Sequence, residues 1–181
     1  MKKNIFFLFY FFLICSICCI VLYNVSKQGI YLTLSITFCT VFFHFAFRLL
    51  IGLIFNLDYN KALKNFYDYR KPWFKEKSFE KKLYKFLQVK QWKKYMPAYS
   101  PETFDLQKRS AEQIITSTCQ AEFIHELNAI LSFLPLFASI LYGKFYVFLF
   151  TSLFASIYEL MFVIIQRFNR PRLIYFSHIN K

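Results

Sequence analysis

The chain is 181 residues long, a length typical of one domain, and 57% of it is hydrophobic, including 26 phenylalanines. Only 18% of the residues are charged, and 3 glycines and 5 prolines leave little material for a loop-rich β fold or a disordered tail. In a soluble protein a net charge of +13 would suggest a nucleic-acid partner. Combined with long apolar stretches, it indicates instead a membrane protein with no nucleic-acid partner.

Four stretches are long and apolar enough to cross a bilayer, which takes about 20 residues of helix. They cover about residues 5–23, 30–57, 123–142 and 145–165. The first follows Lys2 and Lys3, but its apolar run is longer than that of a cleaved signal peptide, and no small-residue cleavage site follows it. We therefore expect an uncleaved anchor in an all-α integral membrane protein, with about four transmembrane helices in a single membrane domain over residues 1–181.

Positive charge is distributed unevenly around these stretches. Twenty of the 23 Lys and Arg residues lie before the first stretch, between the second and third, or after the fourth. Cytoplasmic loops of membrane proteins are enriched in Lys and Arg. We therefore expect a multi-pass protein of the cell membrane with both termini and residues 58–120 in the cytoplasm.

The segment 58–120 is the only sizeable polar part, with fourteen basic and seven acidic residues. Large apolar residues recur in it near a helical period, at Phe79, Leu83, Phe86, Leu87 and Trp92. This pattern predicts an amphipathic interfacial helix with its lysines toward anionic lipid headgroups, followed by an extended stretch from Pro97 and Pro101. Two alternatives are a membrane-hugging linker and a platform for an acidic partner or anionic substrate.

Most enzyme motifs are absent from the sequence. There is no P-loop, no G-x-G-x-x-G, no G-x-S-x-G and no H-E-x-x-H, and no His is followed by Asp five positions later. Cys15, Cys18 and Cys19 lie inside a Phe-rich span, where small packing residues are expected rather than a thiol or metal site. We expect neither a metal nor a cofactor.

A first polar cluster runs from Thr118 to His125. Glu122 and His125 are three residues apart and so lie on one face of a helix. A carboxylate beside an imidazole can hold its tautomer and raise its basicity, as a general base requires. The alternative is an interfacial pair that ends a transmembrane span at headgroup level.

A second polar cluster follows the fourth apolar stretch and contains Gln166, Arg167, Asn169, Arg170, Pro171 and Arg172. Three arginines alone would be explained as a positive-inside stop signal. Such a signal needs neither Gln166 nor Asn169, and Pro171 is expected to stop the helix. Because the guanidinium group is a planar fork of donors, the cluster is also suited to carboxylate or phosphate.

The two clusters are expected to meet. Gly143 and Lys144 form a minimal turn that predicts a helical hairpin, with His125 about 18 residues before it and Gln166 about 22 after. At ~1.5 Å per residue both lie about 30 Å from the turn, which is the thickness of the hydrocarbon core. Glu159 lies two turns deeper and is a functional candidate because ionisable residues inside membranes are costly.

Three motifs resemble the glycosyl-4,4'-diaponeurosporenoate acyltransferase family, over about residues 72–173. The segment FLQVKQWKKYMP, with Trp92 and Lys93, is similar to one family pattern, and STCQAEFIHE, with Glu122 and His125, to a second. The segment IQRFNRPRL is similar to the family's terminal motif. The chain departs from the family patterns at Gln120, Ala98, Tyr99, Glu126, Phe168 and Glu159.

The resemblance implies an acyltransferase of carotenoid glycoside synthesis. The expected donor is a fatty acyl thioester of coenzyme A or acyl carrier protein, and the expected acceptor is a hydroxyl of an apolar glycosylated lipid or carotenoid among the membrane lipids. His125 is expected to be the general base, and Glu122 to orient it. The candidate substrate-binding residues are Gln166, Arg167, Asn169, Arg170, Arg172, Trp92, Lys93 and Glu159.

Two other functions fit parts of the sequence. A non-enzymatic small membrane subunit could use the Phe-rich surface and the basic segment to bind lipid or to scaffold a complex. A transporter or proton-relay component could use His44, Arg48 and Glu159, although such a component needs polar residues spread through the membrane depth.

Overall fold

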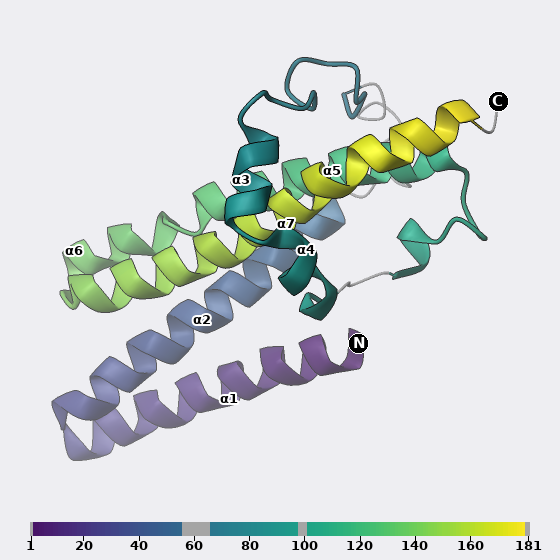
Figure 1. Cartoon of the computed structure of the whole chain (residues 1–181). Helices are drawn as coiled ribbons and strands as arrows, with labels where there is room; N and C mark the ends of the chain where they lie inside the picture. Colours follow the sequence, from purple (N-terminus) through teal and green to yellow (C-terminus); the bar gives the residue numbers. More distant parts are fainter. Residues whose placement is uncertain (1, 56–65, 98–100, 180–181) are drawn as a thin grey trace. The chain divides into compact units, whose positions relative to one another are not determined.

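The computed structural model describes residues 2–55, 66–97 and 101–179, and every regular element in these ranges is helical (Figure 1). The elements are α1 Lys2–Ser26, α2 Gly29–Ile54, α3 Glu80–Phe86, α4 Val89–Trp92, η2 Lys93–Tyr95, η3 Pro101–Phe104, α5 Ala111–Leu131, η4 Leu134–Ala138, α6 Ser139–Tyr142 and α7 Phe145–Ile179. Within the described ranges, four helical stretches are long and apolar enough to cross a membrane. The predicted all-α fold with about four transmembrane helices is therefore confirmed.

Parts of two predicted segments lie outside the described residues, namely the end of the second span at 56–57 and residues 58–65 and 98–100 of the interfacial segment.

Long apolar helices suit a bilayer because each backbone N–H and C=O is paired within the segment. Several hydroxyl groups inside these helices are paired with carbonyls of their own helix. Ser35 donates to the carbonyl of Leu32 at 2.8 Å, and Thr40 donates to that of Ile36 at 2.8 Å. Such local hydrogen bonds let small polar residues occupy an apolar span without an unsatisfied group.

The described residues divide into two compact units. The first comprises Met1–Leu53 and Leu127–Glu159 and contains α1, α2, the end of α5 and the first half of α7. Its first two helices form a hairpin (Figure 1). Phenylalanine rings pack between them, among them Phe9 and Phe42, whose ring centroids are 4.7 Å apart. Its second hairpin turns at Gly143, whose φ of +63° favours glycine.

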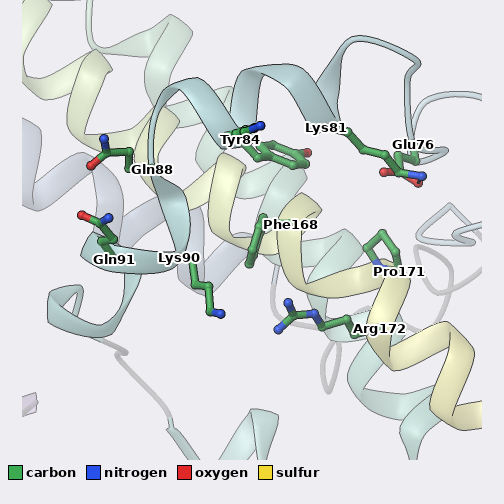
Figure 2. Close-up of a pocket in the computed structure, with 10 residues that line it drawn as sticks. Glu76, Lys81, Tyr84, Gln88, Lys90, Gln91, Phe168, Pro171 and Arg172 are labelled. Carbon is green, nitrogen blue, oxygen red and sulfur yellow. Dashed lines mark ion pairs between the residues drawn. The ribbon is translucent and has the colours of Figure 1, made fainter.

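The second unit comprises Ile54–Glu126 and Leu160–Lys181 and contains both predicted polar clusters. It joins α3, α4 and the first half of α5 to the second half of α7. Tyr84 of α3 packs edge-on against Phe168 of α7, with ring centroids 5.4 Å apart. A pocket of about 480 Å³ lies between α3, α4 and α7 (Figure 2).

The third transmembrane helix begins at Ala111, twelve residues before the predicted apolar span. Its start is a capping box, in which Ser110 Oγ accepts from Gln113 N at 3.3 Å and Gln113 Oε1 accepts from Ser110 N at 3.0 Å. The same helix leaves the α form at Leu131 and continues as η4 around Pro135, which cannot donate a backbone hydrogen bond.

The prediction that Pro171 stops the last helix is wrong. Pro171 lies inside α7, which continues to Ile179. Arg167 and Arg170 on its N-terminal side are both anchored to groups outside α7. These anchors hold the helical path although proline removes one backbone donor, a defect that otherwise costs about 3 kcal/mol or more.

The single amphipathic helix predicted around residues 79–92 is broken in two. Gln88 adopts the left-handed conformation, with φ +51°, and separates α3 from α4. The buried side of the segment carries Glu80, Tyr84 and Val89, whereas the side chain of Phe86 is 81% exposed. The inward face is therefore centred on polar groups, because Glu80 and Tyr84 form part of a hydrogen-bond network.

Candidate active site

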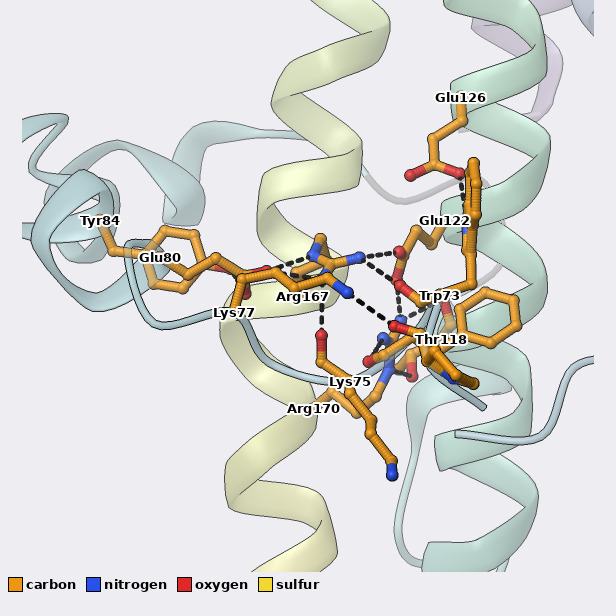
Figure 3. Close-up of polar contacts among 12 residues, drawn as sticks. Trp73, Lys75, Lys77, Glu80, Tyr84, Thr118, Glu122, Glu126, Arg167 and Arg170 are labelled. Atoms are coloured by element: carbon orange, nitrogen blue, oxygen red, sulfur yellow. Dashed lines mark hydrogen bonds and ion pairs between the residues drawn. The ribbon is translucent and has the colours of Figure 1, made fainter. Parts of the chain in front are cut away.

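Arg167 of α7 is surrounded by protein acceptors (Figure 3). Its Nε and Nη2 donate to Glu80 Oε1 at 3.0 and 2.5 Å, and its Nη1 donates to the Trp73 carbonyl at 3.1 Å and to Glu122 Oε1. Nη2 also donates to the Lys75 carbonyl at 2.9 Å. A guanidinium group has five N–H donors, so these contacts use all of them.

Arg170, one turn further along α7, is held in a similar way and is only 2% exposed. Its Nε donates to Thr118 Oγ1 at 3.0 Å, and its Nη1 donates to the Phe74 carbonyl at 2.9 Å. Its Nη2 donates to the Thr118 carbonyl at 3.3 Å and to Glu122 Oε2. Four of its five N–H donors therefore act within the protein.

Glu122 lies at the centre of this network and is 0% exposed (Figure 3). Its two carboxylate oxygens accept from two different guanidinium groups, those of Arg167 and Arg170. A buried carboxylate is stable only when it is paired and hydrogen-bonded. The predicted meeting of the two polar clusters is thus seen directly, and Glu122 is the residue through which they meet.

Glu80 completes the charge balance and was not predicted from the sequence. It is 4% exposed, accepts from Arg167, and accepts from Tyr84 Oη at 2.6 Å. Burial alone would raise the pKa of Glu80, but hydrogen bonds from Arg167 and Tyr84 and the charge of Arg167 outweigh it and hold the pKa below its ordinary value. The network therefore joins two carboxylates, those of Glu80 and Glu122, to two guanidinium groups.

The backbone of residues 73–75 supplies three consecutive acceptors to the two arginines. The Trp73 indole Nε1 donates to Glu126 Oε2 at 2.8 Å, so a second contact ties this loop to α5. Glu126 is one of the positions where the sequence departs from the family pattern. No residue type identifies carbonyl acceptors in a sequence, which explains why this loop was not predicted to belong to the site.

His125 lies one turn beyond Glu122 on α5. Its ring stacks on Phe162 of α7, with centroids 4.7 Å apart and an interplanar angle of 11°. The stack fixes the plane of the imidazole beside the arginine network. The catalytic roles given to His125 and Glu122 stay predictions, and the recorded contacts of Glu122 link it to the arginines.

Two of the remaining predicted residues of the second unit, Lys93 and Arg172, lie over the ring of Phe168. Lys93 Nζ donates to Asn169 Oδ1 at 2.7 Å and lies 4.6 Å from the centre of the Phe168 ring. Arg172 covers the same ring at 5.4 Å. Trp92 Nε1 donates to the Leu87 carbonyl at 2.9 Å, and the side chain of Gln166 is buried at 9% exposure.

Glu159 belongs to the first unit, unlike the other candidate site residues. It forms an ion pair with Arg48 of α2 and is only 1% exposed. Arg48 also donates to the Ala155 carbonyl at 3.4 Å. The pair offsets the cost of two ionisable side chains inside transmembrane helices.

Over the described residues, the fold and the site together define a helical, multi-pass membrane protein with a buried arginine–carboxylate network in the second half of its last helix. The sequence profile of the glycosyl-4,4'-diaponeurosporenoate acyltransferase family matches residues 70–178, and the chain belongs to this family. The predicted resemblance is confirmed, and an acyltransferase-like function follows from it. No curated protein and no solved structure matches the chain.

Proposed function

We propose that the chain transfers a fatty acyl group from a thioester donor to a hydroxyl of a glycosylated lipid or carotenoid, at the cytoplasmic boundary of the membrane. The observation that carries this proposal is the row formed by Glu122 and His125 on α5, which faces Phe162, Arg167 and Arg170 of α7. All five residues lie within the segment matched by the acyltransferase family. The row combines a potential base with a pre-organised electrostatic environment.

In the proposed reaction, His125 takes the proton of the acceptor hydroxyl as its oxygen attacks the thioester carbonyl. The tetrahedral oxyanion then collapses and the carbon–sulfur bond breaks. The imidazolium returns its proton to the departing thiolate, which leaves an ester and a free thiol. General base catalysis of this kind contributes about 10²–10⁴-fold to the rate.

Glu122 and the two arginines act in this proposal as positioning residues. Because their donors are used inside the protein, Arg167 and Arg170 hold α5, α7 and the 73–75 loop around the reacting groups. Glu122 lies one turn from His125 on α5 and holds this part of the helix against α7 through its contacts with the two arginines. This differs from the sequence-based expectation that the arginines bind the substrate directly.

The proposed orientation places both termini and the polar segment 58–120 in the cytoplasm. The thioester then approaches from the aqueous side, and the apolar acceptor reaches His125 laterally through the membrane. An exposed apolar surface on the transmembrane helices, for example Phe154 at 69% and Ile140 at 80%, is the surface that lipids and an apolar acceptor would contact.

The test is His125→Ala in cells that make the acylated product, with the product measured by lipid and pigment mass spectrometry. We expect loss of the product at unchanged protein abundance, because the side chain of His125 is only partly buried. The matched control is His178→Ala, at an exposed position near the end of α7, which should leave the product unchanged.

A non-enzymatic subunit would behave differently in the same experiment. Both histidine variants would then leave any acylated product unchanged, and loss would follow only from changes to the lipid-facing phenylalanines. Full product with His125→Ala at equal abundance would contradict the proposed mechanism.

A further inference from the structure

We propose that the pocket between α3, α4 and α7 binds the phosphorylated adenosine end of a coenzyme A thioester. This inference rests on the proposed function and names the carrier class that the site accepts. The pocket belongs wholly to the second unit and has a volume of about 480 Å³, within the ~300–1,000 Å³ range of small-molecule sites.

Cationic side chains outnumber carboxylates in the lining of this pocket (Figure 2). Four cationic side chains line it, Lys81, Lys85, Lys90 and Arg172, against a single carboxylate, Glu76. The only ion pair recorded among them joins Lys81 and Glu76 at 3.9 Å, between exposed side chains, and such a pair contributes little. The pocket therefore keeps a net positive charge suited to more than one phosphate group.

The pKa of Lys93, which lies beside the pocket residue Phe168, is affected by the same positive charges. The pKa of Lys93 is lowered, first by its partial burial and then by the positive charges of Arg172 and Lys90. Like charges gathered around one pocket repel each other, and a bound polyanion would relieve that repulsion.

The uncharged part of the lining fits a nucleoside better than a simple anion. Phe168 and Tyr84 contribute aromatic side chains to the lining, and Gln88 and Gln91 contribute amide donors and acceptors (Figure 2). Aromatic faces stack on bases, and amides can pair with the edge of adenine. A phospholipid headgroup has no comparable ring.

The pocket is also connected to the proposed reaction centre. Tyr84, which lines it, donates to Glu80, and Glu80 accepts from Arg167. Because Arg167 and Arg170 have their donors used inside the protein, they are poor candidates for the carrier phosphates. Lys81, Lys85, Lys90 and Arg172 are the cations that remain for them on this side of α7.

The experiment measures binding of adenosine 3',5'-bisphosphate to the purified full chain in nanodiscs of neutral phosphatidylcholine, with adenosine 5'-phosphate as the comparison ligand. We expect the bisphosphate to bind more tightly. Lys90→Gln combined with Arg172→Gln should weaken its binding about tenfold or more, the effect expected when charge-assisted hydrogen bonds are lost. Lys82→Gln is the matched control, because Lys82 lies on α3 outside the pocket lining.

A kinetic measurement separates this inference from the proposed function. The double variant should raise the KM for a fatty acyl coenzyme A about tenfold with little change in kcat. Equal bisphosphate binding by wild type and double variant would overturn the pocket assignment even if acyl transfer is intact. Bisphosphate binding in a chain without acyl transfer would instead overturn the proposed function alone.

Two further outcomes would also overturn the assignment. One is acyl transfer from acyl carrier protein only, with no competition by the bisphosphate. The other is loss of phosphatidylglycerol binding in the double variant when the bisphosphate binds neither protein, which would make the pocket a lipid headgroup site.

Discussion

Lysine would be a poor substitute for Arg170, although it would keep the positive charge. The planar group of Arg170 serves Thr118, Phe74 and Glu122 at once, in three directions fixed by the guanidinium geometry. An ammonium group has three donors on a flexible stem and cannot span these acceptors. The residue therefore contributes geometry to the site in addition to charge.

We predict that Arg170→Lys lowers the thermal midpoint of the purified protein in detergent, in the absence of any substrate. The free energy of unfolding should fall by about 1–3 kcal/mol, because at least one buried acceptor is left without its donor. Arg172→Lys is the control, since Arg172 is exposed and the change keeps its charge. An unchanged midpoint with Arg170→Lys and a selective rise in KM would indicate substrate contact instead of positioning.

At the residue scale, the sequence indicated the residues of α5 and α7 that form the network, but not the residues of the 73–80 segment. Glu122, His125 and the arginines of α7 could be selected because they are polar residues at the ends of apolar stretches. Glu80 could not be selected in the same way, since it is one of several acidic residues in a segment crowded with lysines. Its importance comes from burial against Arg167 and Tyr84, which depends on tertiary packing.

At the scale of elements, the missed features follow from local chemistry. The capping box of Ser110 and Gln113 marks the start of α5 well before its apolar stretch, so hydropathy alone places the beginning of this helix too late. The break at Gln88 carries no such signal, because glutamine is not a residue that favours the left-handed region. The helical path of α7 through Pro171 depends on contacts made by Arg167 and Arg170, which no local rule includes.

The pairing of α2 with α7 in the first unit rests in part on one intramembrane ion pair. Arg48 and Glu159 face each other, with side-chain exposures of 23% and 2%. The sequence predicted both residues as functional candidates without predicting their contact. A charge inside a span that is paired with an opposite charge needs no transported ligand to explain it, which weakens the transporter alternative.

We predict that Glu159→Leu reduces the amount of membrane-inserted protein several-fold, because it leaves Arg48 charged in a transmembrane helix. Arg48→Leu combined with Glu159→Leu should recover most of the wild-type amount, since a buried ion pair can often be replaced by apolar residues. Quantitative immunoblots of membrane fractions measure the outcome. Normal abundance with Glu159→Leu, together with lost acyl transfer, would support the predicted substrate-binding role of Glu159 instead.

At the scale of the whole molecule, the segment that matches the family does not include all of the transmembrane helices. The match begins at residue 70 and so includes α3 to α7, whereas α1 and α2 precede it. All residues of the arginine–carboxylate network lie inside the matched part. The first two helices contribute the Phe-rich hairpin and Arg48, which are features of the first unit.

The distribution of basic residues leads to a prediction about how the four helices cross the membrane. An even number of crossings places both termini on one side, and the excess of Lys and Arg predicts that this side faces the cytoplasm. In a variant without native cysteines, Lys94→Cys and His178→Cys should react with a membrane-impermeant thiol reagent only after the inner face is opened. Lys94 and His178 are exposed, as is Lys144, which serves as the control below, so a lack of labelling at any of them cannot be attributed to burial.

Lys144→Cys is the matched control, because Lys144 lies in the turn between α6 and α7 at the opposite end of the last hairpin. We expect it to be labelled from outside intact cells, which would establish the crossing of α7 by itself. Labelling of Lys94→Cys or His178→Cys from outside would place the arginine–carboxylate network on the external face. Because fatty acyl coenzyme A is a cytosolic donor, that result would remove both the proposed donor and the proposed pocket ligand.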